Sequence, residues 1–208
     1  MRDLPREDVA GGVGLTFDDG CESDYTVAFP ELVKRGLKAT FYVVTSYVGR
    51  RGYVQWHHLR ELRRYGMEIG SHSATHPCFL DLSPRAMAEE LRRSKRTLED
   101  RLGEAVASFS VPFGFVNRQV IAAALAEGFE TVCTSQTRLA NPQASPRVYG
   151  RFAVRRTDSL GHFVGIVARR RPTLWRIALV ESGKQAGKRL LGRRVWLAFR
   201  RRCLERRG

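Results

Sequence analysis

The chain has 208 residues, of which 43% are hydrophobic and 27% are charged, and it carries a formal net charge of +15. The length fits one domain with an appendage, and the composition is ordinary for a soluble globular protein. The four cysteines are scattered without a CxxC pair, which excludes a disulfide framework and a thiolate zinc site, and no apolar stretch reaches the length that spans a membrane.

Short apolar strands and helices are expected to alternate along the chain. The strands are expected at residues 12–17, 39–44, 67–73, 105–111, 129–135 and 150–154, and the helices at 25–36, 56–66, 83–103 and 117–128. The third helix has the clearest ends, because Ser83 is a typical N-cap, Pro84 suits the first helical position and Gly103 suits the stop. The alternation predicts right-handed βαβ units and a mostly parallel sheet, either open or closed into a barrel. In both, functional residues collect at the carboxyl ends of the strands.

Two adjacent carboxylates, Asp18 and Asp19, directly follow the first expected strand in the stretch TFDDG. Like charges in contact destabilise each other, and a carboxylate at a strand end is costly unless something compensates for it. A turn that uses one Asp as a cap and leaves the other solvated is the commoner interpretation of a lone DDG. The rest of the sequence has to decide between a turn and a site.

His72 and His76 lie in the stretch SHSATHP, which follows the third expected strand. Two imidazoles four residues apart can converge on one ion if the backbone turns tightly, and with a carboxylate oxygen they suit zinc or a neighbouring first-row divalent ion. A His₂Asp set leaves positions open for water, so one Asp can bind the metal while the other accepts a proton from the metal-bound water. Either motif alone is weak, but the two together predict hydrolysis of an amide or ester.

TFDDG at residues 16–20 and SHSATHP at residues 71–77 resemble, in order, motifs of the polysaccharide deacetylases, which are carbohydrate esterase family 4 and share the nodulation chitooligosaccharide deacetylase homology domain. The likeness covers roughly residues 10–165. It implies an α/β fold of the distorted (β/α) barrel type. It also implies metal-dependent removal of an N-acyl group, above all N-acetyl, from an amino sugar of a glycan or a lipid-linked glycan precursor.

The same resemblance assigns roles to individual residues. Asp18 is implied as the general base, and the metal ligands are implied as Asp19, His72 and His76, with zinc as the preferred ion. The stretch SVPFG stands where the family has its third motif, so the backbone N–H of Phe113 is expected to stabilise the oxyanion of the tetrahedral intermediate.

Two departures from the family pattern leave a second hypothesis open. The third motif usually opens with an arginine that orients the catalytic Asp, and Ser110 and Val111 stand there instead. The late Leu-x-Leu-His motif, which supplies the acid for the leaving amine, is absent, and the only late histidine is His162. By its local pattern His162 lies early in a helix, so we expect a structural role for it, with the general acid as the alternative. The chain could therefore be a catalytically impaired family member that acts as a glycan-binding or scaffold module.

Residues 169–208 are expected to form a basic helical extension after a barrel of residues 1–168. They hold 14 of the 36 basic residues and two of the 21 acidic residues. Apolar residues at spacing four beside arginines suit the anionic surface of a membrane, while a helix packed on the barrel with a solvated basic face is the alternative. Nucleic-acid binding is not expected, because no recognition motif supports it. The opening residues lack the apolar run of a signal peptide, so the expected location is cytoplasmic, with peripheral attachment to the inner face of the membrane.

Overall fold

The computed structural model describes residues 12–141, 143 and 145–180 of the chain. The chain groups into two compact units, Met1–Arg151 and Phe152–Gly208. The expected boundary between barrel and extension, after residue 168, lies inside the second unit. Most of the basic helical extension expected at residues 169–208 lies outside the described residues.

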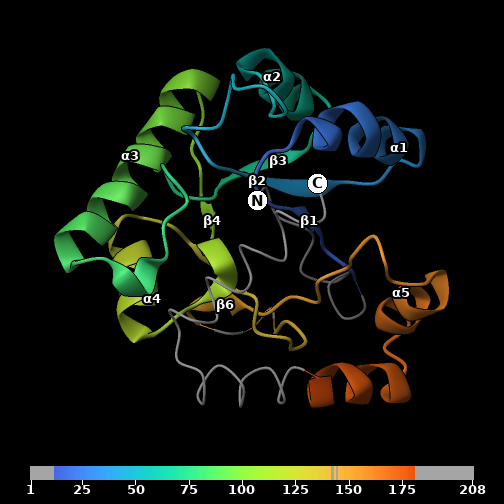
Figure 1. The fold of residues 1–208 in the computed structure, drawn as a ribbon. Coiled ribbons are helices and arrows are strands. Elements are labelled where there is room, and N and C mark those ends of the chain that lie inside the picture. Colours follow the sequence, from blue (N-terminus) through green and yellow to red (C-terminus); the bar gives the residue numbers. More distant parts are fainter. Residues whose placement is uncertain (1–11, 142, 144, 181–208) are drawn as a thin grey trace. The chain divides into compact units, whose positions relative to one another are not determined.

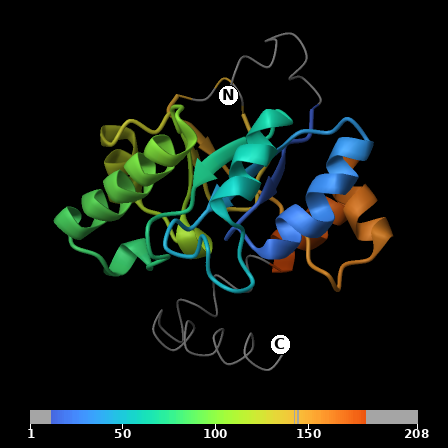
Figure 2. The same ribbon diagram turned by 90° about the horizontal axis from the view of Figure 1, so that it is seen from above.

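The first unit is built on a curled sheet of six parallel strands in the order β1-β2-β3-β4-β5-β6. The strands are Leu15–Phe17 (β1), Ala39–Val43 (β2), Glu68–Ser71 (β3), Ser108–Ser110 (β4), Thr131–Cys133 (β5) and Arg147–Tyr149 (β6). The helices are Phe29–Lys34 (α1), Trp56–Arg64 (α2), Pro84–Leu102 (α3) and Arg118–Ala126 (α4). They surround one face of the sheet, with α3 beside α4 (Figures 1 and 2). The predicted α/β fold of the distorted-barrel type is therefore confirmed as a half-barrel.

Apolar side chains at helical spacing fix the helices on the sheet. Leu59 and Leu62 of α2 are fully buried, as their spacing on one helix face predicts. On α3 the buried positions are Met87, Leu91, Ser94 and Leu98. The helix begins where Ser83 accepts a hydrogen bond from the N–H of Ala86 and ends at Gly103, whose φ of 72° is left-handed. The core between helices and sheet thus follows directly from the sequence pattern.

The face of the sheet that points away from the helices is polar, because successive strand residues alternate between faces. Glu68 accepts hydrogen bonds from Thr40 at 2.8 Å and from Ser108 at 2.7 Å. The ring of Tyr42 lies over Gly70, where a Cβ atom would come within 2.5 Å of it. A large side chain of one strand therefore fills the space beside a small residue of the next strand. Together these side chains form a layer below the carboxyl ends of the strands.

The last strand lies earlier in the chain than expected. The strand expected at residues 150–154 is wrong in position, because β6 is Arg147–Tyr149 and ends before Gly150. A Cβ atom at Gly150 would lie 2.2 Å from the carbonyl oxygen of Gln136, so only glycine allows the two chain segments to come this close. Arg151 consequently follows the strand and lies at its carboxyl end.

The second unit holds the helix Leu160–Val167 (α5) and a further helical stretch at residues 171–180. The two helical stretches meet at Gly165, where a Cβ atom would come within 2.2 Å of the Thr173 hydroxyl oxygen. Ser159 caps α5 by accepting a hydrogen bond from the N–H of His162. Within the described part of the chain, none of the helices combines the length and the hydropathy needed to cross a bilayer.

Candidate active site

Asp18 and Asp19 form a tight turn at the carboxyl end of β1. Asp19 has a φ of 77° and Gly20 a φ of 72°, so the chain reverses direction directly after the strand. At Gly20 a Cβ atom would lie 3.3 Å from Val43, which makes glycine the natural residue there. The turn sends the two carboxylates to different partners, and each has a distinct environment.

His72 and His76 are carried by the loop that follows β3. The N–H of His72 bonds to the carbonyl of Val43 at 2.8 Å and so extends the pairing of β2 with β3 by one residue. His76 has a φ of 61°, and the loop returns so that the two imidazole rings lie 4.9 Å apart. The tight turn that the spacing of these histidines required is therefore present.

Asp19, His72 and His76 form one cluster with the geometry of a metal site. The Nε2 atoms of both histidines lie 3.3 Å from Asp19 Oδ1, and the three candidate ligand atoms all lie within 4.8 Å of one another. His72 Nδ1 lies 2.7 Å from the carbonyl oxygen of Ser110, which can only accept, so Nδ1 carries the hydrogen and Nε2 of the neutral ring presents a lone pair to the cluster. Lone pairs and a carboxylate that face one another fit a divalent cation between them.

The electrostatics of Asp19 agree with this arrangement. Burial alone would raise the pKa of its carboxyl group, but when Nε2 of His72 and His76 carries a proton, their hydrogen bonds and positive charge outweigh burial and hold that pKa well below its usual range. A divalent cation between the three side chains would supply positive charge in place of those protons. Asp19 is therefore ionised at neutral pH, which is the form that binds a metal ion.

Asp18 is held by an arginine that the sequence did not reveal. Arg151, at the end of β6, donates to Asp18 Oδ1 at 2.8 Å and to Oδ2 at 2.7 Å, and also to the hydroxyls of Ser110 at 2.8 Å and Thr16 at 3.1 Å. Burial alone would lower the pKa of Arg151, but the Asp18 carboxylate outweighs burial and keeps that pKa above its usual value. The bidentate contact fixes the plane of the Asp18 carboxylate.

Phe113 lies in the turn Pro112–Gly114 (η3) that follows β4. Its φ is 59°, and its ring lies 4.6 Å from the ring of His76. A Cβ atom at Gly114 would lie 2.0 Å from the hydroxyl oxygen of Ser135, so glycine is required next to Phe113. The ring of Phe113 therefore packs against one histidine of the Asp19–His72–His76 cluster.

Comparison with known proteins agrees with this geometry. The sequence model of the polysaccharide deacetylase family, described as "Polysaccharide deacetylase", matches residues 6–132. The chain belongs to this family. The resemblance carried by TFDDG and SHSATHP is thus confirmed.

Relatives in the deacetylase family include curated proteins and solved structures. YxkH of Bacillus subtilis is 28% identical over 142 residues, which cover 68% of this chain and 49% of YxkH. The peptidoglycan-N-acetylglucosamine deacetylase PgdA of Listeria monocytogenes is 32% identical over 120 residues, which cover 57% of this chain and 25% of PgdA. The chain thus spans half or less of the length of these two relatives. The structure of IcaB from Ammonifex degensii superimposes with a TM-score of 0.67 at 29% identity, covering 75% of this chain and 71% of IcaB.

Most of the expected site residues of this deacetylase-family chain lie together in the first unit. They are Asp18, Asp19, His72, His76 and Phe113. Ser110, one of the two residues that replace the family's arginine, contacts both His72 and Arg151. Arg151 could have been found from its sequence position only if the last strand had been placed correctly, because an arginine at a strand's carboxyl end is a candidate site residue.

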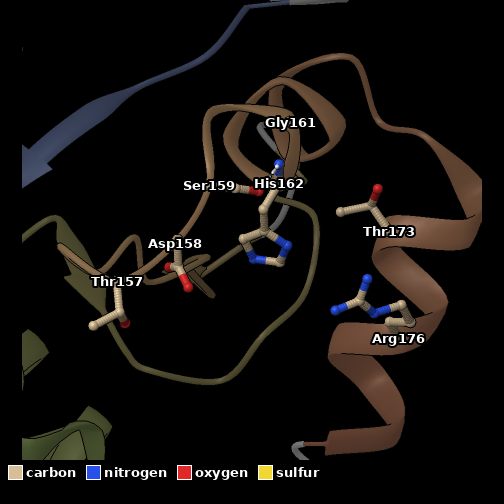
Figure 3. A pocket seen from close by; sticks show the side chains of 7 residues that line it. All are labelled: Thr157, Asp158, Ser159, Gly161, His162, Thr173 and Arg176. Atoms are coloured by element: carbon tan, nitrogen blue, oxygen red, sulfur yellow. Dashed lines mark hydrogen bonds between the residues drawn. The ribbon is translucent and has the colours of Figure 1, made fainter.

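His162 belongs to the second unit. It lines a surface pocket with neighbours from α5, from the segment before it and from the stretch 171–180. Its ring points into the space between Asp158 and Arg176 (Figure 3). Its position early in α5 agrees with the local sequence pattern, and the expected structural role and its alternative, the general acid, both stay predictions.

Proposed function

We propose that the protein is a metal-dependent hydrolase that removes an N-acyl group, preferentially N-acetyl, from an amino sugar of a glycan or a lipid-linked glycan precursor. The observation that carries the proposal is the separation of two adjacent carboxylates into two environments. Asp19 faces two imidazoles, whereas Asp18 is paired with an arginine. The names of the relatives support the class of substrate, since PgdA is named for N-acetylglucosamine in peptidoglycan.

In this proposal Asp19, His72 and His76 hold a divalent ion, with zinc preferred. When bound, such an ion polarises the amide carbonyl and lowers the pKa of a water molecule toward neutrality. Asp18 accepts the proton of the attacking water. Its side chain is 34% exposed, so water can reach it. Oδ2 accepts hydrogen bonds from both Arg151 and the Ser110 hydroxyl, whereas Oδ1 accepts one from Arg151 and keeps a second lone pair for that proton.

The remaining roles concern charge and orientation. Arg151 and Ser110 hold the Asp18 carboxylate in one plane, so that the base does not have to be oriented during the reaction. The peptide N–H of Phe113 is proposed to stabilise the oxyanion that forms when water adds to the carbonyl. For His162 a structural role is expected, and the alternative, protonation of the leaving amine, is tested by His162→Ala.

The first test needs no knowledge of the sugar. Elemental mass spectrometry of the purified full-length chain should find a near-stoichiometric divalent ion that is lost in His72→Ala/His76→Ala and retained in His57→Ala. His57 is a matched control because it is exposed on α2. The metal-loaded protein should then release acetate from N-acetylglucosamine oligomers or peptidoglycan. No metal in the unaltered protein, even after zinc is added, would refute the proposal.

A second candidate function is a glycan-binding or scaffold module of low catalytic power. It is favoured by the absence of the late Leu-x-Leu-His motif, because the only late histidine is then His162, for which a structural role is expected. The two candidates differ in one measurement. A module would bind N-acetylated glycans and keep its metal, yet release no acetate. His162→Ala would change neither its glycan binding nor its metal content.

The second unit is proposed to attach the protein to an anionic membrane surface, at the inner face of the membrane in a cytoplasmic location. Trp175 is 69% exposed and Leu179 is 60% exposed, one turn apart on the stretch 171–180. Arg176 lies between them in a segment, residues 169–208, that is strongly basic. Exposed apolar residues with arginines suit the boundary between lipid headgroups and acyl chains.

A further inference from the structure

The loop that carries both histidines has an unusual backbone. Ser73 has a φ of 70° and His76 a φ of 61°, although neither is glycine. A residue with a side chain in this left-handed region is strained, and it stays there only when its surroundings hold it. The loop contains no disulfide and no regular secondary structure, so its contacts with the rest of the unit must provide that restraint.

Glu90, on α3, supplies one such contact. Its Oε2 atom accepts hydrogen bonds from the backbone N–H groups of Ala74 at 3.0 Å and Thr75 at 2.9 Å, and its Oε1 atom accepts one from the Thr75 hydroxyl at 2.8 Å. One carboxylate thus accepts three hydrogen bonds, two of them from backbone N–H groups, and fixes the middle of the loop between His72 and His76. Bonds to a charged acceptor are stronger than those between neutral groups.

Ser94, one turn further along the same face of α3, supplies the second contact. It donates to the carbonyl of Leu91 at 2.9 Å, so it accepts the bond from Ser71, whose hydroxyl oxygen lies 2.7 Å away. Ser71 in turn accepts from the N–H of Ser73 at 3.2 Å, and Ser73 accepts from the N–H of His76 at 2.9 Å. A continuous series of hydrogen bonds therefore runs from α3 to the backbone of the second histidine.

We propose that Glu90 is a positioning residue that sets the separation of His72 and His76 and thereby the affinity of the protein for its metal ion. The inference rests on the proposed function in taking these histidines as ligands. Without the Glu90 carboxylate, the N–H groups of Ala74 and Thr75 lose their acceptor and the loop samples other conformations. Metal binding must then order the loop, which weakens affinity even though no ligand has been removed.

The test compares full-length variants after removal of metal. The variants are Glu90→Ala, Thr75→Val and, as matched control, Glu89→Ala, whose residue is the exposed neighbour of Glu90 on α3. The Kd for Zn²⁺ is measured by competition with a chromophoric chelator, and the geometry of the site by the visible absorption of bound Co²⁺. The melting temperature of each metal-free variant reports on any purely structural role.

Glu90→Ala is expected to raise the Kd for Zn²⁺ roughly 10- to 100-fold and to change the Co²⁺ spectrum. Thr75→Val removes one of the three bonds without changing the shape of the side chain, and it should raise the Kd roughly fivefold. Glu89→Ala should match the unaltered protein. If Glu90→Ala does not fold, Thr75→Val still tests the positioning role, because Thr75 is exposed and its replacement should not unfold the protein.

Two negative results have different meanings. A Kd within twofold of the unaltered protein in both Glu90→Ala and Thr75→Val would overturn this inference alone, whatever happens to the melting temperature. Failure of the unaltered protein to bind Zn²⁺ would overturn the metal assignment and this inference with it.

Discussion

The contact between Arg151 and Asp18 gives the sharpest prediction about catalysis. Arg151→Lys keeps the positive charge, but a single ammonium group cannot bond both carboxylate oxygens in one plane while it also bonds Ser110 and Thr16. At least one charge-assisted hydrogen bond is lost, and such a bond contributes about 1.5–3 kcal/mol. If that energy serves to orient the base, kcat should fall about 10- to 100-fold, since about 1.4 kcal/mol corresponds to a factor of ten.

The assay is acetate release by the zinc-loaded protein, with metal content measured on the same samples. Metal content should stay unchanged, because the Arg151 guanidinium bonds to Asp18, to the hydroxyls of Ser110 and Thr16 and to the carbonyl of Thr134, none of which is a member of the Asp19–His72–His76 cluster. Arg147→Lys is the matched control, since Arg147 is an exposed arginine at the other end of the same strand. A variant Arg151→Lys that keeps full kcat, or that loses activity only together with its metal, would refute the positioning role.

Other predictions concern the base, a buried acid and the second unit. Asp18→Asn should abolish acetate release and keep the metal, and wild-type turnover in that variant would show that another group is the base. The pKa of Asp24 is raised to about 7 by burial, with further contributions from Asp19 and Asp18, and its Oδ2 atom has no hydrogen-bond partner. Because the folded-state pKa lies above the ordinary value of 3.8, stability is lost as pH rises from about 4 to about 7. Asp24→Asn in metal-free protein should therefore gain in melting temperature relative to the unaltered chain between pH 5 and pH 8, and a pH-independent difference would contradict this. Deletion of residues 172–208 should abolish binding to anionic vesicles but spare activity on a soluble substrate; equal vesicle binding would remove the membrane proposal.

The sequence predicts elements well where local chemistry determines them. Ser83 and Gly103 mark the ends of α3 because an N-cap and a left-handed stop depend on neighbouring residues only. The candidate metal ligands could be predicted from the expected parallel sheet. Asp19 and the two histidines follow strands of one parallel sheet, and the carboxyl ends of all such strands lie on the same side of the sheet.

Long-range contacts could not be predicted in this way. Glu90 looks like an ordinary acidic residue on an amphipathic helix, and only the packing of α3 against the loop after β3 brings its carboxylate to Ala74 and Thr75. Arg151 falls inside the strand expected at residues 150–154. Its contact with Asp18 joins residues 133 positions apart, and no local pattern encodes such a separation.

The position of Arg151 also explains how a half-barrel can build this site. In the strand order, β1 and β6 are the two opposite edges of the sheet, yet Arg151 at the end of β6 bonds to Asp18 and Thr16 of the β1 segment. The sheet must therefore curl until its edges approach each other, and the ion pair bridges the remaining gap. An arginine on a central strand, as the family's third motif provides, would orient the base without joining the edges. In this chain the same contact orients Asp18 and holds the curl, so Arg151→Ala should lower both the activity and the melting temperature, whereas Asp18→Asn, which keeps an acceptor for Arg151, should lower activity far more than stability.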